Sequence, residues 1–484
     1  MAYEASHNVV IDKDVRSRAE QDALNFTPSQ VATTVYAASA VDTSVVTSDS
    51  QYRCRADALQ GHETTDDGGT TTSKYTYRSD IDAKRFIRRI EGRAYNTLNE
   101  TYFFPSDDDE WVRLNKEHVA FVLSLGGLYP AADEVSALLA PVPGQRKRIL
   151  DLGCGTGVWS MDMAHDFPEA EVVGVDLAPV PVDLETLPPN LRFEIDDINL
   201  GLAHFKDSFD VVHMRLVGSG LKNFRKTMSD GQRCLKPGGI AIFIDADYDM
   251  YAEDRYTYVP FALEEDEQNP EQTERSWWQR IVYEMRRGAV NVVKSDIYGM
   301  SKAMDEGLWE DEIMDPETCR TASLYLPIGP WAQGESQMET QQIGYLGALI
   351  RQDVMSAHRA GHAVLKRLGW EPDRLDRWSE LTDKQMMSLK PKTWLRMCYA
   401  WGRRRAAENE PAPPLSPIAP STIAGADPTL RYPHYYIYQT REESLCEAAL
   451  RNRGKDCEPP PLPKCSPRAT GSPPSVTSIQ QRGV

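Results

Sequence analysis

Short apolar runs recur along the middle of the chain, and most of them end at an acidic residue or lead into glycine. They lie at residues 148–151, 171–176, 192–195, 209–215 and 240–244. Each run has the length of a buried strand and is too short for a buried helix. Helical patterns at residues 159–164 and 222–235 alternate with these runs. Alternating strands and helices favour parallel pairing, so the pattern predicts a sheet that helices cover on both faces.

The pattern is less regular between about residues 250 and 375. Helical periodicity returns at residues 277–287 and 343–368. Residues 321–331 predict a sixth strand that leaves into a rigid turn, and residues 392–402 predict a last strand. The sheet is therefore expected to hold seven strands, with helical insertions at about 250–320 and 335–390.

A helical extension is expected to precede the sheet. Phe86, Ile87 and Ile90 fall on one face of a predicted helix, which either covers a sheet edge or closes over a substrate. A second helix follows an acidic run, with Ser106 as its predicted N-cap and an apolar stripe that begins at Trp111. Acids in a first turn suit the helix dipole, so this run favours helix initiation over metal binding.

The two ends of the chain differ in composition from the rest. Residues 1–78 are rich in Ser, Thr and Asp, and residues 406–484 are rich in Pro. The first stretch offers too little apolar surface to offset the entropy lost on ordering, and the second is rich in proline, so both are predicted to be mostly disordered. Residues 432–450 are expected to form one ordered segment in the second tail. This leaves a helical cap at 79–145 and a main domain at 146–405.

A glycine-rich loop follows the first strand of the main domain. It reads Asp151-Leu152-Gly153-Cys154-Gly155-Thr156-Gly157 and opens a helix, an arrangement that directs free backbone N–H groups at a ligand. Asp176 ends the next strand, 19 residues beyond Gly157. A carboxylate at this distance can accept hydrogen bonds from both hydroxyls of an adenosine ribose. In a dinucleotide-binding motif, G-x-G-x-x-G, the third glycine would stand at position 158, but here it is Gly157. The pattern therefore favours an adenosine cofactor other than a dinucleotide.

Charge and composition exclude several classes of function. The formal net charge of −18 opposes binding to polyanions, and no long basic patch is present, so we expect no nucleic-acid partner. No run approaches the ~18 apolar residues of a membrane-spanning helix. The eight cysteines are scattered without a C-x-x-C pair, which indicates a reducing compartment without a structural zinc. A cytoplasmic location is predicted, with the nucleus as the alternative.

The motifs together resemble the fungal LaeA-like class I methyltransferases. They are GRAY at 92–95, YFFP at 102–105, DLGCGTGVW at 151–159, VVGVDLAP at 172–179, FEIDD at 193–197, HMR at 213–215, LKPGG at 235–239 and LPIGPW at 326–331. The resemblance covers about residues 80–405. It implies a Rossmann-like fold with a seven-stranded, mostly parallel sheet that ends in a reversed hairpin near Arg405. It also implies S-adenosylmethionine as cofactor, and either a small secondary metabolite as methyl acceptor or a regulatory role with a velvet-type protein partner.

The resemblance assigns roles to individual residues. An acid at the end of the third strand contacts the adenine, and Asp197 is preferred over Asp196 for this role. The residues expected to bind the cofactor are Asp151, Gly153, Cys154, Gly155, Gly157, Asp176, Leu177, Asp196, Asp197, Ile198 and Met214.

Methyl transfer from a sulfonium depends mainly on positioning, and a base is needed only if the acceptor must lose a proton. His213 is the candidate base and Arg215 the candidate substrate-positioning residue; the alternative is that both only form the pocket wall. His358 and His362 have the spacing of metal ligands on a helix, but no third ligand is evident, and a packed or solvated helix face is favoured. Residues 403–405 are three arginines that favour a solvated strand end over a nuclear signal.

Overall fold

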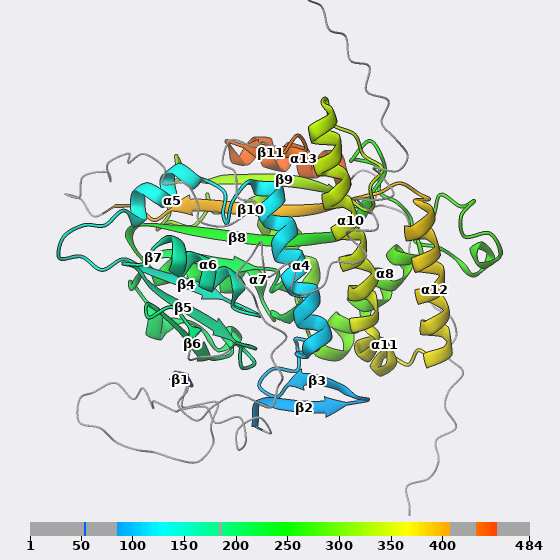
Figure 1. The fold of residues 1–484 in the computed structure, drawn as a ribbon, viewed down its shortest axis with the longest axis horizontal. Helices are drawn as coiled ribbons and strands as arrows, with labels where there is room; N and C mark the ends of the chain where they lie inside the picture. Colours follow the sequence, from blue (N-terminus) through cyan, green and yellow to red (C-terminus); the bar gives the residue numbers. More distant parts are fainter. Residues whose placement is uncertain (1–52, 55–84, 183–185, 407–431, 453–484) are drawn as a thin grey trace, which may run out of the picture.

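A mixed β-sheet forms the centre of the protein (Figure 1). The computed structural model describes residues 53–54, 85–182, 186–406 and 432–452. Within these residues the sheet has nine strands in the order β1-β6-β5-β4-β7-β8-β10-β9-β11. Their bounds are β1 Arg53–Cys54, β4 Arg148–Leu152, β5 Glu171–Asp176, β6 Leu191–Ile195, β7 Phe209–Arg215, β8 Leu235–Tyr251, β9 Arg320–Pro327, β10 Trp394–Arg403 and β11 Tyr435–Tyr438.

The pairing directions match a Rossmann-like methyltransferase sheet. Strands β6, β5, β4, β7 and β8 pair in parallel, whereas β10 lies antiparallel between β8 and β9. The expected seven-stranded sheet with a reversed last strand is thus confirmed. Two further strands extend its edges: β1 pairs with β6, and β11 pairs with β9. Strand β8 is also longer than the predicted run, because it includes the LKPGG turn and continues to Tyr251.

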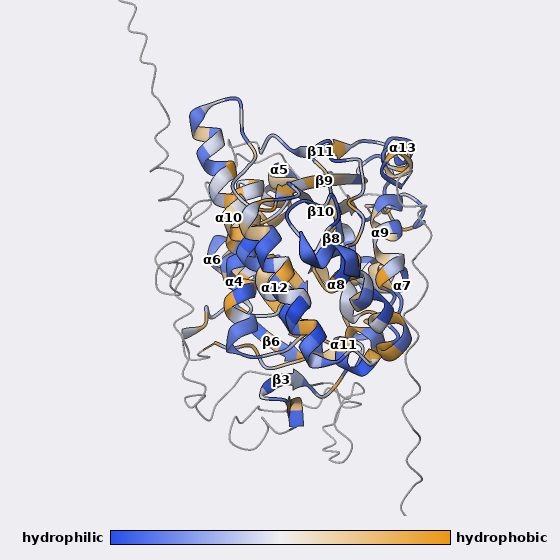
Figure 2. Ribbon diagram, turned by 90° about the vertical axis from the view of Figure 1, so that its right-hand side faces the viewer, coloured by the Kyte–Doolittle hydropathy of each residue, from blue (hydrophilic) through white to orange (hydrophobic). Residues whose placement is uncertain are grey.

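Side-chain alternation along the strands divides the core into two layers. Ile149 of β4 and Val211 of β7 face one layer, and the next residues, Leu150 and Val212, face the other. Helices α4, α5, α6, α8, α10, α11 and α12 pack on the first face, while α7 and α9 pack on the second. Figure 2 shows the helices on both sides, with α13 beside α9. Buried apolar strands covered on both faces explain the continuous apolar runs of the sequence.

The helices have the following bounds: α4 Asp108–Leu125, α5 Ala132–Leu139, α6 Val158–Asp166, α7 Phe224–Cys234, α8 Trp277–Gly288, α9 Ile297–Glu306, α10 Gln337–Ala360, α11 His362–Leu368, α12 Pro372–Ser388 and α13 Arg441–Asn452. Short 3-10 turns are η3 Ile198–Leu200, η4 Ala203–Phe205, η5 Gly218–Gly220 and η6 Glu264–Gln268, and η7 Ala289–Val293 is a π-helical turn. No helix in the described ranges is both long and apolar enough to cross a bilayer.

The N-terminal extension differs from its prediction. The stretch with Phe86, Ile87 and Ile90 is a β-hairpin, formed by β2 Ile87–Ile90 and β3 Arg93–Asn96, and the expected helix is wrong. Glu91 and Gly92 between the strands both have positive φ, 50° and 83°, as a two-residue type I′ turn requires. The next helix, α4, is present, but its N-cap is Asp107 and the predicted cap Ser106 is wrong.

The expected ordered segment near residues 432–450 is present as β11 and α13. The predictions of disorder fall on residues 1–78 and 406–484. Apart from β1, residue 406 and the segment 432–452, these residues lie outside the described ranges.

Candidate functional site

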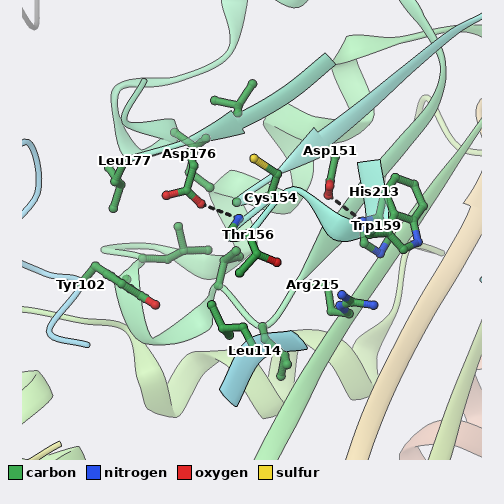
Figure 3. Close-up of a pocket in the computed structure, with 18 of the residues that line it drawn as sticks. Tyr102, Leu114, Asp151, Cys154, Thr156, Trp159, Asp176, Leu177, His213 and Arg215 are labelled. Atoms are coloured by element: carbon green, nitrogen blue, oxygen red, sulfur yellow. Dashed lines mark hydrogen bonds and ion pairs between the residues drawn. The ribbon is translucent and has the colours of Figure 1, made fainter. Parts of the chain in front are cut away.

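A pocket opens where the parallel strands β4, β5, β6 and β7 end (Figure 3). Carboxyl ends of parallel strands meet at one edge of a sheet, so the loops that follow them converge there. The pocket encloses about 870 Å³ of empty space, part of it open to solvent. The predicted residues in its wall are Asp151, Gly153, Cys154, Gly155, Asp176, Leu177, Asp196, Asp197, Ile198, His213 and Arg215.

Gly155 brings the backbone of the loop to the pocket surface. Its φ is +56°, a value that other residues rarely adopt, and a Cβ at this position would stand 3.4 Å from Cδ1 of Leu114 in α4. Its N–H donates to Oδ2 of Asp176 at 2.8 Å. Glycine here therefore keeps the space between the loop and α4 open and ties the loop to the next strand.

Asp176 is held in place by backbone donors on both of its oxygens. Besides the bond from Gly155, Oδ1 accepts from the N–H of Ala178 at 3.1 Å. Burial raises the pKa of Asp176 to about 6, and these backbone N–H groups oppose the rise. The carboxylate is thus held in a fixed orientation at the end of β5, in the wall of the pocket.

The two acids after β6 differ in how they are held. Oδ1 of Asp197 accepts from the backbone N–H of Asn199 at 3.0 Å and from Nδ2 of Asn99 at 3.2 Å. Oδ1 of Asp196 accepts from the N–H of Asp197 at 2.8 Å, and its Oδ2 lies 3.5 Å from Nε2 of His204. Both acids line the pocket. Asp197, as the cap of η3, also fixes the backbone of Ile198.

His213 and Asp151 face each other on adjacent strands. They are register partners on β7 and β4, and Nδ1 of His213 lies 2.8 Å from Oδ1 of Asp151. Because a carboxylate oxygen accepts, Nδ1 carries the proton and Nε2 holds the lone pair. That Nε2 is buried and has no hydrogen-bond partner among the described residues. The ring also stacks on Trp159, with centroids 3.7 Å apart, and burial lowers the pKa of His213.

The burial of the His213 side chain, which is 1% exposed, favours a wall residue over a base. The other oxygen of Asp151 accepts from the Ser160 hydroxyl at 2.6 Å, so both of its oxygens are engaged. Arg215 extends the same buried network, because Nη2 lies 3.2 Å from Nδ1 of His118, and its guanidinium lies 4.9 Å from the centre of the Phe121 ring.

A second pocket adjoins the first. Its empty space is about 760 Å³, part of it open to solvent, and apolar side chains of α4, α8, α10 and the strands β8, β9 and β10 form most of its wall. Tyr102, Leu114, Glu117 and Leu216 line both pockets and so form their common boundary. The charged residues of the second wall are Arg113, Glu117 and Asp353.

Comparison with known proteins identifies this arrangement. The family described as methyltransferase domain matches residues 127–281. The chain is 32% identical to a secondary metabolism regulator laeA of Coprinopsis cinerea over 328 residues, which cover 68% of this chain and 76% of that protein. The chain belongs to the fungal LaeA-like class I methyltransferases. It is therefore an S-adenosylmethionine-dependent methyltransferase by fold and family.

Other relatives of this LaeA-like protein carry different names. A protein-methionine methyltransferase laeA of Emericella nidulans is 29% identical over 189 residues, 39% of this chain and 48% of that protein. A methyltransferase str2 of Strobilurus tenacellus is 32% identical over 156 residues, 32% of this chain and 52% of that protein. The names include both regulators and methyltransferases, so they leave the acceptor open.

Two residues predicted to bind the cofactor are not among the lining residues of the first pocket in this LaeA-like fold. Gly157 caps α6, and a Cβ there would stand 2.6 Å from the Phe193 ring, so this glycine serves packing between the helix and β6. Met214 is fully buried in the core layer that faces α7, because it alternates with His213 along β7. The structure brings neither residue to the pocket wall.

Sequence reasoning also missed part of the pocket wall. Asn99, Tyr102, Leu114 and Glu117 reach the pocket from the N-terminal extension and α4. Leu216, Val217, Gly220 and Leu221 reach it from the loop after β7. The YFFP motif and the apolar stripe of α4 were the sequence signals near these residues. Periodicity alone, however, predicts that such a stripe packs into the core and does not indicate a pocket wall.

The remaining candidates have structural partners. Nε2 of His358 lies 3.1 Å from Oδ1 of Asp383, and Nε2 of His362 lies 3.0 Å from the hydroxyl of Ser379, so both imidazoles pack against α12. At the end of β10, Arg403 and Arg404 contact Glu134 and Asp207 respectively.

Proposed function

We propose that this LaeA-like protein transfers the methyl group of S-adenosylmethionine to a small, largely apolar metabolite bound in the second pocket. The observation that carries the proposal is the common boundary of the two pockets. A cofactor in the first pocket and an acceptor in the second would meet at Tyr102, Leu114, Glu117 and Leu216. Methyl transfer needs such a meeting, because the acceptor atom must approach the methyl carbon in line with sulfur.

The residues of the first pocket fit the cofactor. Asp176 would accept from the ribose hydroxyls, Asp197 and Ile198 would border the adenine, and the loop at Gly153 and Gly155 would accommodate the methionine end. The glycine without a Cβ at the pocket surface and the preorganised carboxylate support this fit. The bound cofactor supplies an electrophilic methyl group, and the protein supplies position and shields the reaction from water.

The lining of the second pocket supports an apolar acceptor of modest size. Its walls include Phe121, Trp278, Ile350 and Leu395, which recognise apolar surface without directional hydrogen bonds. A metabolite with few polar groups would replace water there at little cost.

Calorimetric titration of S-adenosylmethionine into the full chain tests the cofactor site. Micromolar binding is expected, and Asp176→Ala should weaken it about ten- to a hundredfold, because a charged acceptor of hydrogen bonds is lost. Asp133→Ala removes an exposed carboxylate of α5 that is outside the pocket and serves as the matched control. A folded wild-type chain that does not bind would refute the proposal.

A second candidate function is regulation of secondary metabolism in a complex with a velvet-type protein. The Coprinopsis relative named a regulator supports it, since the similarity extends over 76% of that protein. Recovery of such a partner with the tagged chain, together with changes in many metabolites in a deletion strain, would favour regulation. Loss of one methylated metabolite, with others unaffected, would favour the enzymatic role.

A further inference from the structure

We propose that Glu117 of α4 is the general base of the reaction and that the acceptor presents a hydroxyl or an amine to its carboxylate. This inference rests on the proposed function, because it places the reacting atoms at the boundary of the two pockets. It names a class of substrate: an apolar molecule with an O–H or N–H group at the end that faces the cofactor.

The position of Glu117 supports this role. It is one of four residues that line both pockets, and the others, Tyr102, Leu114 and Leu216, lack a carboxylate. Leu114 and Glu117 are three residues apart on α4, so they point to the same side of the helix. The side chain of Glu117 is 16% exposed, whereas that of Glu110, seven residues earlier on the same helix, is only 2% exposed.

The charges around Glu117 leave it incompletely neutralised. Arg113 contacts three carboxylates: Glu110 at 2.7 Å, Asp353 of α10 at 2.8 Å and Glu117 at 3.2 Å. Arg113 is shared among the three carboxylates, and its contact with Glu117 is the longest of the three. A hydrogen-bond donor on the acceptor would supply the missing partner.

Groups on the other elements around Glu117 set its affinity for protons. Burial raises the pKa of Glu117 to about 7, and Asp353 and Glu110 act in the same direction. Arg113 and Arg215 of β7 oppose the rise. A carboxyl with a pKa near neutrality can accept a proton from the acceptor more readily than an exposed one can.

Other groups near the boundary are less suited to take a proton. Tyr102 and Tyr248 are neutral, because burial raises the pKa of both phenols. His213 lines only the first pocket, and its side chain is 1% exposed and stacked on Trp159. Asp353 lines only the second pocket and already makes a close contact with Arg113.

The proposed step is balanced without a further reactant. As the acceptor oxygen or nitrogen bonds to the methyl carbon, the carbon–sulfur bond breaks and its electron pair stays on sulfur, which becomes a neutral thioether. The proton of the acceptor passes to the carboxylate of Glu117, and water later removes it. Glu117 would then touch the reacting atom, while Arg113 orients the carboxylate.

Sinefungin provides a test that needs no knowledge of the acceptor. In this cofactor analogue, a carbon that bears an amine replaces the methylated sulfonium. The protonated amine should lie near the boundary of the pockets and pair with Glu117. The wild-type full chain is therefore expected to bind sinefungin more tightly than S-adenosylhomocysteine in calorimetric titrations.

Glu117→Gln keeps the shape of the side chain and removes its charge. It should lower the ratio of the two affinities about ten- to a hundredfold and change the S-adenosylhomocysteine affinity less than about twofold. Glu110→Gln is the matched control at pH 8, where Glu117 is ionised with or without the charge of Glu110; it breaks a contact with the same arginine, lies outside both pocket walls and should preserve the ratio. Raising the pH from 6 to 8 should increase the ratio for the wild type but not for Glu117→Gln.

The outcomes separate this inference from the proposed function. If the wild type and Glu117→Gln have the same ratio while both bind S-adenosylhomocysteine, the role of Glu117 is refuted and the cofactor site stands. If the wild type binds neither ligand, the proposed function fails and the inference fails with it. Thermal unfolding of each variant identifies a folding defect; for an unstable Glu117→Gln chain, Glu117→Asp should retain part of the preference for sinefungin.

Discussion

At the scale of single residues, the carboxylate of Asp176 should make cofactor affinity depend on pH. Its pKa is raised to about 6 by burial, and only the ionised form can accept from both ribose hydroxyls. Binding therefore favours the ionised form, and affinity should fall as pH decreases through 6. Between pH 7 and pH 5 we expect about a tenfold loss of S-adenosylhomocysteine affinity, which calorimetry at several pH values would measure.

Asp176→Asn provides the control for this pH dependence. The amide cannot titrate, so its lower affinity should stay nearly constant over the same range. An unchanged slope in this variant would assign the titration to a different group, and Asp245 is the next carboxyl to test. Burial raises the pKa of Asp245 to about 7, and its oxygens accept from the backbone of Gly218 and Ala246.

At the scale of elements, two glycines of one loop should respond differently to the same substitution. Gly157→Ala forces a Cβ to within 2.6 Å of the Phe193 ring at a φ of +76°. Strain and overpacking together should lower the free energy of unfolding by about 2–4 kcal/mol. Gly155→Ala has comparable backbone strain, but its nearest contact is Leu114 at 3.4 Å, so the added methyl enters the pocket.

Urea unfolding and cofactor titration together distinguish the two effects. Gly157→Ala should mainly reduce stability, and Gly155→Ala should mainly reduce cofactor affinity. The opposite pattern would mean that Gly157 contacts the cofactor, as the sequence motif alone suggests, and that its packing role is secondary.

The elements of the main domain could be predicted because their signals are local. Apolar runs that end at Asp151 or Asp176 define buried strands whose following loops line the pocket. The hairpin of β2 and β3 could not be recognised in this way, since Phe86, Ile87 and Ile90 also satisfy a helical spacing. The turn at Glu91 and Gly92 lacks the Asn-Gly or Asp-Gly pair that usually marks such hairpins.

Only those site residues could be predicted that lie at the end of a strand or in the loop that directly follows it. Asp176 and Asp197 follow from spacing and resemblance, whereas Asn99 reaches Asp197 across 98 residues of sequence. Glu117 depends on how α4 lies against α10 and the loop after β7, which no local pattern encodes. For His213 the sequence left two roles open, a base or a wall residue; its pairing with Asp151 on the neighbouring strand is a feature that no local pattern shows.

At the scale of the whole molecule, the sheet is completed by a segment far along the chain. Strand β11 pairs with β9, and the hydroxyl of Tyr432 donates to the carbonyl of Tyr325 at 2.9 Å. Arg451 of α13 lies 2.8 Å from Asp305 of α9, which also contacts Arg396 of β10. The segment 432–452 thus covers the edge of β9 and belongs to a buried cluster of charges.

A chain that ends at residue 406 should therefore be less stable than one that ends at residue 452. The shorter chain exposes the edge of β9 and leaves Asp305 with one arginine fewer in a buried position. The expected loss is about 3–5 kcal/mol in the free energy of unfolding, together with aggregation through the exposed strand edge. Urea unfolding and light scattering of the two chains would measure both.

The chain that ends at residue 452 is the reference, because it keeps β11 and α13 and lacks only the residues after them. In that chain, Arg451→Met removes the ion pair with Asp305 but keeps the pairing of β11 with β9, so it measures the contribution of the charges alone. If both truncated chains are equally stable, β11 and α13 add little to the fold and their role lies elsewhere. Cofactor affinity should be the same in both, because the pocket is built from α4 and from the ends of β4, β5, β6 and β7. Loss of binding in the shorter chain alone would mean that the far edge of the sheet supports the loops of the site.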